Sequence, residues 1–191
     1  MDNQSSISLE EFRKVVNDTA KSVQEEFPDL FFDYAGMIPN EDESFRYDSS
    51  PINTEVFAMT GGDGVHYSLL KVSDNAQPII MTVPMCFGNS MKSYNRIIAE
   101  NLYEFLGIGF HNGWFFIEQL CYDNEKAINF YSKENKEDGY IIEGDTHFVK
   151  KLRTKLGYKH VPLNNKRLKE LETKHFHKLK FNREFLAKYI D

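Results

Sequence analysis

The segment AMTGGDGVHYSLL, residues 58–70, contains the residues of this sequence whose types and spacing best fit a chemical site. Three glycines and Asp63 separate two apolar runs, and His66 lies just behind them. A phosphate-binding loop needs backbone amides that converge at the start of a helix, usually with a Lys or Ser/Thr following. The residues after these glycines, VHYSLLKV, have the pattern of a strand instead. The segment therefore favours a β-hairpin turn, in which Gly and Asp supply positive φ angles.

Metal binding and nucleophilic catalysis find little support in the same residues. Asp63 and His66 are suitable ligand types, but two side chains are too few for a metal site. Cys86 and Cys121 lie in apolar settings without a pattern that lowers a thiol pKa, and no G-x-S-x-G segment occurs. We expect no metal, no cofactor and no catalytic residue, and two buried free thiols.

Composition indicates a folded chain with an uneven distribution of charge. Apolar residues make up 41% and aromatic residues 14% of the 191 positions, which suits one ordinary domain with a packed core. Residues 147–191 carry ten Lys and three Arg against four acidic residues, a net charge of +9. Since the whole chain has a net charge of -6, residues 1–146 carry -15. An acidic body and a basic C-terminal segment are therefore expected to pack together.

The same charges bear on partners and location. The basic residues near the C-terminus are spread over helical faces with few aromatic residues between them, so nucleic-acid binding is not the favoured interpretation. No apolar run approaches the ~20 residues that span a bilayer, and MDNQSSISLEEF lacks the features of a signal peptide. We expect a cytoplasmic protein that does not bind membranes.

Hydrophobic periodicity predicts an α+β fold. Ser8 and Glu11 form a capping box for a helix over 9–26. Strand-like runs at 55–60, 66–72 and 78–85 are joined by short spacers, which predicts a central meander in an antiparallel or mixed sheet flanked by helices. After Asn89 or Ser90, apolar spacing up to residue 106 predicts a second helix that Gly107 ends.

The C-terminal part is predicted to be helical. GWFFIEQLCYD suggests a buried helix, although so short an apolar run also fits a strand, and DNEKAINFYSK suggests another short helix. A further helix capped by Asp145 is expected to end at Gly157. NNKRLKELETKH and FNREFLAKYI suggest two more, with an extended KLKF between them. We divide the chain into an α+β domain over 1–144 and a basic helical extension over 145–191 that packs on the same domain.

Three segments resemble the core of the SUKH superfamily, which includes fungal cell-wall-synthesis regulators and bacterial immunity proteins. They are FAMTGGDGVHYSLL, PIIMTVPMCFG and IIAENLYEFLGIG, and the similarity covers about residues 52–110. The chain also resembles a group of bacterial proteins that share TGGDGVH and EQLxYD segments. The N-terminal LP-x-x-Y-x-x-F helix that is usual in the superfamily is not evident here. The resemblance implies an α+β domain that binds another protein without a cofactor.

Together these observations predict a non-enzymatic protein-binding domain of immunity or regulatory type. Its acidic body suits a basic partner, such as a toxin that acts on nucleic acid, because complementary charge speeds encounter and selects partners. The candidate contact residues are Asp63, His66, Glu41, Asp42 and Glu43. The alternative is an enzyme or small-ligand-binding protein with a pocket beneath the glycine turn, lined by His66, Tyr67 and Trp114.

Overall fold

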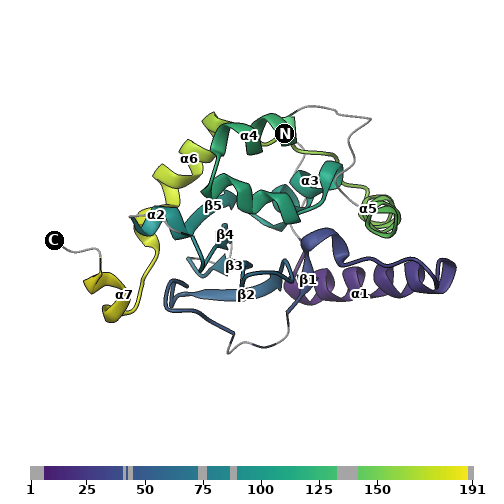
Figure 1. The fold of residues 1–191 in the computed structure, drawn as a ribbon, viewed down its shortest axis with the longest axis horizontal. Helices are drawn as coiled ribbons and strands as arrows, with labels where there is room; N and C mark the ends of the chain where they lie inside the picture. The colour runs from purple at the N-terminus through teal and green to yellow at the C-terminus, as the bar shows by residue number, and fades with distance from the viewer. Residues whose placement is uncertain are drawn as a thin grey trace.

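The computed structural model describes residues 7–40, 42, 45–72, 77–86, 90–132 and 142–188. Within these residues the fold is α+β, as predicted, and one antiparallel sheet has the strand order β1-β2-β3-β4-β5 (Figure 1). The strands are β1 (Ile38–Pro39), β2 (Thr54–Met59), β3 (His66–Leu70), β4 (Ile79–Thr82) and β5 (Asn95–Ala99). The α-helices are α1 (Leu9–Glu26), α2 (Met91–Tyr94), α3 (Leu102–Asn112), α4 (Asn124–Ser132), α5 (Glu143–Leu156), α6 (Asn165–His175) and α7 (Arg183–Ala187). Short 3-10 helices lie at η1 (Tyr34–Gly36), η2 (Phe115–Cys121) and η3 (Phe176–Lys178).

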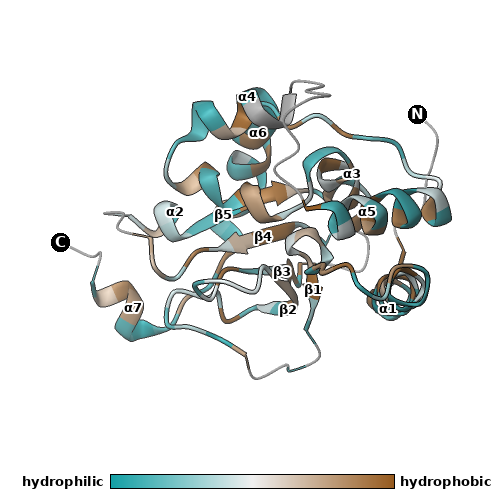
Figure 2. Ribbon diagram, turned by 45° about the vertical axis from the view of Figure 1, so that its right-hand side comes forward, coloured by the Kyte–Doolittle hydropathy of each residue, from teal (hydrophilic) through white to brown (hydrophobic). Residues whose placement is uncertain are grey.

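The main hydrophobic core covers one face of the sheet. Alternation along β3 directs Tyr67 and Leu69 to this face, where α1, α3 and α5 contribute Phe12, Phe105 and Phe148. The capping box of α1 is present as predicted, with the Glu11 amide donating to Ser8 Oγ at 3.1 Å. Figure 2 shows hydrophobic residues along the central strands and mixed character on the helices.

The second face of the sheet is covered by the C-terminal segment. Leu70, Ile80 and Ile97 on this face pack with Leu171 of α6 and Phe185 of α7. In Figure 1, α7 lies at the opposite end of the molecule from α1 and α5. The division at residue 145 stays a prediction, and its boundary falls within α5, which contacts α1.

The helix predicted after Ser90 begins as expected with α2, but the prediction is wrong in its continuity and in its end at Gly107. Residues 95–99 form β5 because Ile97 and Ile98 each find a buried environment, on opposite faces of the sheet. Helix α3 then continues through Gly107 to Asn112. A Cβ at Gly107 would crowd the Lys159 carbonyl oxygen at 2.9 Å, so this glycine permits a close chain approach rather than ending the helix.

Asp145 does not cap α5, contrary to expectation. Its Oδ1 accepts hydrogen bonds from the backbone amides of Asp33 at 2.9 Å and Ala35 at 2.8 Å. These bonds fix a turn in which Tyr34, Ala35 and Gly36 all have positive φ. Burial raises the pKa of Asp145 to about 7, helped by a hydrogen bond that its protonated form donates to the Asp33 carboxylate, while the two backbone hydrogen bonds oppose the shift. Gly157 ends α5 in the left-handed conformation, as predicted.

Candidate functional site

The glycine segment forms the hairpin turn between β2 and β3. Met59 pairs with His66 at the ends of the two strands, and the Thr60 amide donates to the Val65 carbonyl at 3.0 Å. Gly61, Asp63 and Gly64 have φ angles of 86°, 48° and 72°. The prediction of a conformational role for these residues is confirmed, because their backbone lies in the region that favours glycine.

Asp63 projects from this turn into solvent. Its side chain makes no hydrogen bond or ion pair with any residue that the structure describes. A non-glycine residue with positive φ is uncommon, and Asp is among the residue types that adopt it most readily. The turn therefore holds an unneutralised carboxylate at the end of the sheet.

His66 is placed differently from the sequence-based hypothesis. Its side chain is fully buried, so it cannot touch a partner from this position. Its Nδ1 lies 2.8 Å from the Gly64 carbonyl oxygen and its Nε2 lies 3.1 Å from Ser50 Oγ. Burial lowers the pKa of His66 to about 4, and Arg46 adds to this effect, while the hydrogen bond to Gly64 opposes it. His66 is a neutral ring that joins the turn to the loop at 45–51.

Tyr67 and Trp114 do not line an open pocket. Both side chains are fully buried in the main core. The Tyr67 hydroxyl donates to the Trp114 carbonyl at 2.7 Å, and the Trp114 indole N–H donates to the Phe105 carbonyl at 3.0 Å. Because these polar atoms are already paired within the core, the two residues stabilise the fold and offer no surface to a ligand from solvent.

The acidic loop before β2 is only partly described. Glu41 and Glu43 lie outside the described residues, and Asp42 is exposed. The Asp42 carbonyl accepts the Phe45 amide at 3.2 Å. Further along this loop the Tyr47 phenol lies against Gly64, where an added Cβ would collide with it. The loop that follows Asp42 therefore reaches the glycine turn.

Glu118 and Tyr122 reach the same surface from a distant part of the sequence. Helix η2 brings Glu118 close enough to Asp63 that the two negative charges interact. Burial raises the pKa of Glu118, and the charge of Asp63 raises it further. The Tyr122 side chain is 53% exposed. The burial of its remaining part raises the pKa of its phenol, and smaller contributions come from Cys86, Glu118, Cys121 and Asp63.

We call this region the turn surface. It combines two carboxylates with three exposed side chains that are largely apolar: Tyr47, Asp63, Met85, Glu118 and Tyr122. Tyr47 and Met85 line one surface cavity, which lies between the loop at 45–51, the end of β4 and α7. Sequence reasoning missed Glu118 and Tyr122 because no local pattern links η2 to a turn more than fifty residues earlier, and it missed Met85 because no pattern places the residues after β4 beside the loop at 45–51.

The two cysteines beneath this surface are unreactive. Cys86 is buried, its Sγ donates weakly to the Cys121 carbonyl at 3.9 Å, and both thiols are free. Burial raises the pKa of Cys121 to about 12, although Arg96 opposes the shift. A thiol with such a pKa stays protonated at neutral pH and is a poor nucleophile. Cys121 is partly exposed, which differs from the expectation that both thiols are buried.

Two further observations cover the described part of the chain. No group of three or more His, Cys, Asp or Glu side chains in these segments is arranged to hold a metal ion. No helix formed by these segments combines the length and apolar character that crossing a membrane requires.

In comparisons with known proteins, the chain matches no family model, no curated protein and no solved structure.

Proposed function

We propose that this chain is a non-enzymatic protein-binding domain that recognises a basic partner through the turn surface, as an immunity or regulatory protein of the SUKH type. The observation that carries the proposal is the gathering of Asp63 and Glu118 with exposed Tyr47, Met85 and Tyr122. Exposed aromatic residues and Met are enriched in protein interfaces, where they anchor the contact. Carboxylates beside them favour a cationic partner.

The electrostatics of Glu118 support the sign of that partner. Burial and the neighbouring Asp63 both disfavour the charged form of Glu118 in the free protein. A Lys or Arg side chain placed between the two carboxylates would relieve their repulsion and lower the pKa of Glu118. The net charge of -6 over the whole chain adds long-range attraction for a basic protein.

Affinity capture from the source organism tests this proposal. Asp63→Asn combined with Glu118→Gln removes two charges from the turn surface, while Asp18→Asn combined with Glu25→Gln removes two exposed charges from α1. A specific basic partner should bind the wild type and the α1 variant alike, and the turn variant about tenfold or more weakly. If its affinity for the turn variant equals that for the wild type, the turn surface is not the binding site.

A growth assay tests the immunity role separately. If the captured partner is a toxin, co-expression of the wild type should restore growth, and the turn variant should protect less well. If the protein binds the toxin but does not restore growth, it does not give immunity against that toxin, and a regulatory role is the remaining interpretation of the complex.

A further inference from the structure

A groove lies where helices α1 and α5 pack against each other, at the opposite end of the molecule from α7 (Figure 1). Its volume of about 430 Å³ falls within the range of small-molecule sites. Helix α1 contributes Ser22 and Glu26, and helix α5 contributes Lys150, Lys151 and Lys155. Residues four apart lie on the same face of a helix, so each helix presents one polar face to the groove.

Lys151 is anchored in this groove by two residues of α1. Its ammonium group donates to Ser22 Oγ at 3.0 Å and to a carboxylate oxygen of Glu26. An ammonium group has three N–H donors, so one remains for a ligand, and the side chain is still 27% exposed. The Ser22 hydroxyl accepts from Lys151, and its own proton has no acceptor among the residues that the structure describes. Two donors on positioned groups are therefore available here.

Lys150 and Lys155 bring two further ammonium groups from α5. Both side chains are exposed, and neither makes a hydrogen bond or ion pair within the described part of the chain. The charge of Lys155 reaches Asp18, but Asp18 is already paired with Lys14 at 2.7 Å. Lysine is a common phosphate-binding residue, because its ammonium group is a compact charge with three donors.

The charges that line the groove do not cancel. Three lysines stand against one carboxylate, that of Glu26, so two positive charges are in excess when histidine is counted as neutral. Glu143 lies outside the lining, 3.9 Å from His147 Nε2. A phosphate monoester carries a charge of about -1.5 to -2 at pH 7, which matches this excess.

Phe27 and His147 give the groove an aromatic end. Their rings are stacked, with centroids 3.9 Å apart, and both line the groove. Phe27 follows the last residue of α1 and packs against the main core, which holds its ring in place. Helix α5 rises about 12 Å from His147 to Lys155, so the aromatic end is separate from the last lysine. An organic group attached to the phosphate can therefore contact the rings while the phosphate contacts the lysines.

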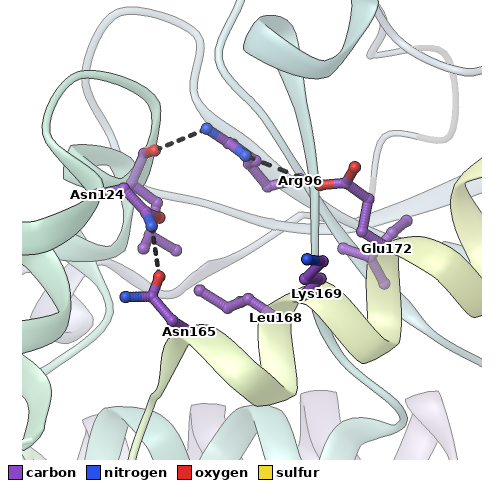
Figure 3. A pocket seen from close by; sticks show the side chains of 8 residues that line it. Arg96, Asn124, Asn165, Leu168, Lys169 and Glu172 are labelled. Atoms are coloured by element: carbon purple, nitrogen blue, oxygen red, sulfur yellow. Dashed lines mark hydrogen bonds and ion pairs between the residues drawn. The ribbon is translucent and has the colours of Figure 1, made fainter.

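The cavity beside β5 differs in how its charges are used (Figure 3). There, Arg96 donates to the Leu120 carbonyl at 3.2 Å and lies 4.0 Å from a Glu172 carboxylate oxygen. Glu172 is also paired with Lys92. The charges of that cavity are largely satisfied within the protein, so the groove between α1 and α5 is the better site for an anion.

We propose that the groove between α1 and α5 binds a small organic phosphate monoester. The phosphate oxygens accept hydrogen bonds from the three lysines and from the Ser22 hydroxyl group, and the organic part rests on Phe27 and His147. The groove shares no residue with the turn surface, so this proposal does not depend on the proposed protein partner.

Amide chemical-shift titrations with phenyl phosphate, at about 0.15 M salt, test the proposal. Phenyl sulfate is the matched ligand, because it has nearly the same shape and one negative charge less. Phenyl phosphate should give saturable shifts centred on residues 22–27 and 147–155 and should bind about tenfold more tightly than phenyl sulfate. Inorganic phosphate should bind more weakly than phenyl phosphate, because it makes no contact with the two rings.

A pair of double variants tests the lysines. Lys150→Gln combined with Lys155→Gln should weaken phenyl phosphate binding by about tenfold or more, because charge-assisted hydrogen bonds are lost. Lys166→Gln combined with Lys169→Gln removes two exposed charges from α6 and should leave the affinity unchanged. All four side chains are exposed, so both variants should stay folded, and the spectra of the free variants check this directly.

Several results would overturn the proposal. They are the absence of saturable shifts at the groove, equal affinity for phenyl phosphate and phenyl sulfate, equal affinity for phenyl phosphate and inorganic phosphate, and equal effects of the two double variants. The protein should also stay in solution when it is centrifuged with vesicles that contain phosphatidate. Its sedimentation with these vesicles, but not with vesicles of neutral lipid, would instead assign the monoester to a lipid headgroup.

Discussion

His66 makes the stability of the protein depend on pH, and its replacement by Gln isolates this dependence. The folded protein holds the pKa of His66 at about 4, whereas the reference value for an exposed histidine is 6.5. Between about pH 4 and pH 6.5, His66 is therefore protonated in the unfolded chain and neutral in the folded chain. The stabilising effect of keeping His66 neutral is complete above about pH 6.5 and is lost as the pH falls toward 4.

The magnitude follows from these two pKa values. Between about pH 7.5 and pH 5 the linkage relation gives a loss of about 2 kcal/mol in the free energy of unfolding, and about 3 kcal/mol is lost by pH 4. Asp145 acts in the opposite direction. Its folded pKa of about 7 lies above its reference value of 3.8, so its contribution is complete below about pH 3.8 and is lost as the pH rises through 7. The wild-type profile alone therefore mixes two opposed effects.

Urea unfolding of the wild type and His66→Gln at several pH values separates them. Both proteins share the Asp145 contribution, so the difference between their free energies of unfolding should shrink by about 2 kcal/mol from pH 7.5 to pH 5. His177→Gln, which replaces an exposed histidine, is the matched control and should follow the wild type. A difference between wild type and His66→Gln that stays constant over this range would refute the burial argument. NMR signals of the His66 ring that titrate near pH 6.5 would do the same.

Two further predictions concern the fold itself. Gly36→Ala should lower the free energy of unfolding by about 2–4 kcal/mol, because φ is +79° and the added Cβ would meet the backbone of Phe115. Gly157→Ala, at a φ of +65° with open space around it, should lower the same free energy by only about 1 kcal/mol. If urea unfolding shows that the two variants lose equal free energy of unfolding, the close approach of Phe115 to Gly36 does not add to the cost. Phe185→Ala should lower the free energy of unfolding by about 3 kcal/mol in the same assay, because this side chain is 3% exposed and its ring centroid lies 5.5 Å from that of Phe181. Phe31→Ala, at 74% exposure, is the control and should change stability by less than about 0.5 kcal/mol. A Phe185→Ala variant as stable as the wild type would mean that α7 contributes little to the second face.

The sequence by itself determined the elements that local patterns specify. Ser8 and Glu11 mark the start of α1 because a capping box needs only four residues, and Gly157 ends α5 because its own φ angle decides it. The β2–β3 hairpin also follows from its turn residues and the strand patterns on either side. These features depend on interactions between residues close in the chain.

Tertiary structure decided the features that depend on distant partners. Residues 95–99 form a strand because their backbone pairs with β4 and their apolar side chains are buried on both faces of the sheet. Their apolar spacing in the sequence also fits a helix. Asp145 does not cap α5, because its carboxylate accepts hydrogen bonds from backbone amides more than one hundred residues away in the sequence. His66 became a buried link rather than a surface contact because the loop at 45–51 lies over it. The meeting of Asp63 with Glu118 likewise required η2 to pack beside the hairpin turn, and no spacing in the sequence specifies that distance.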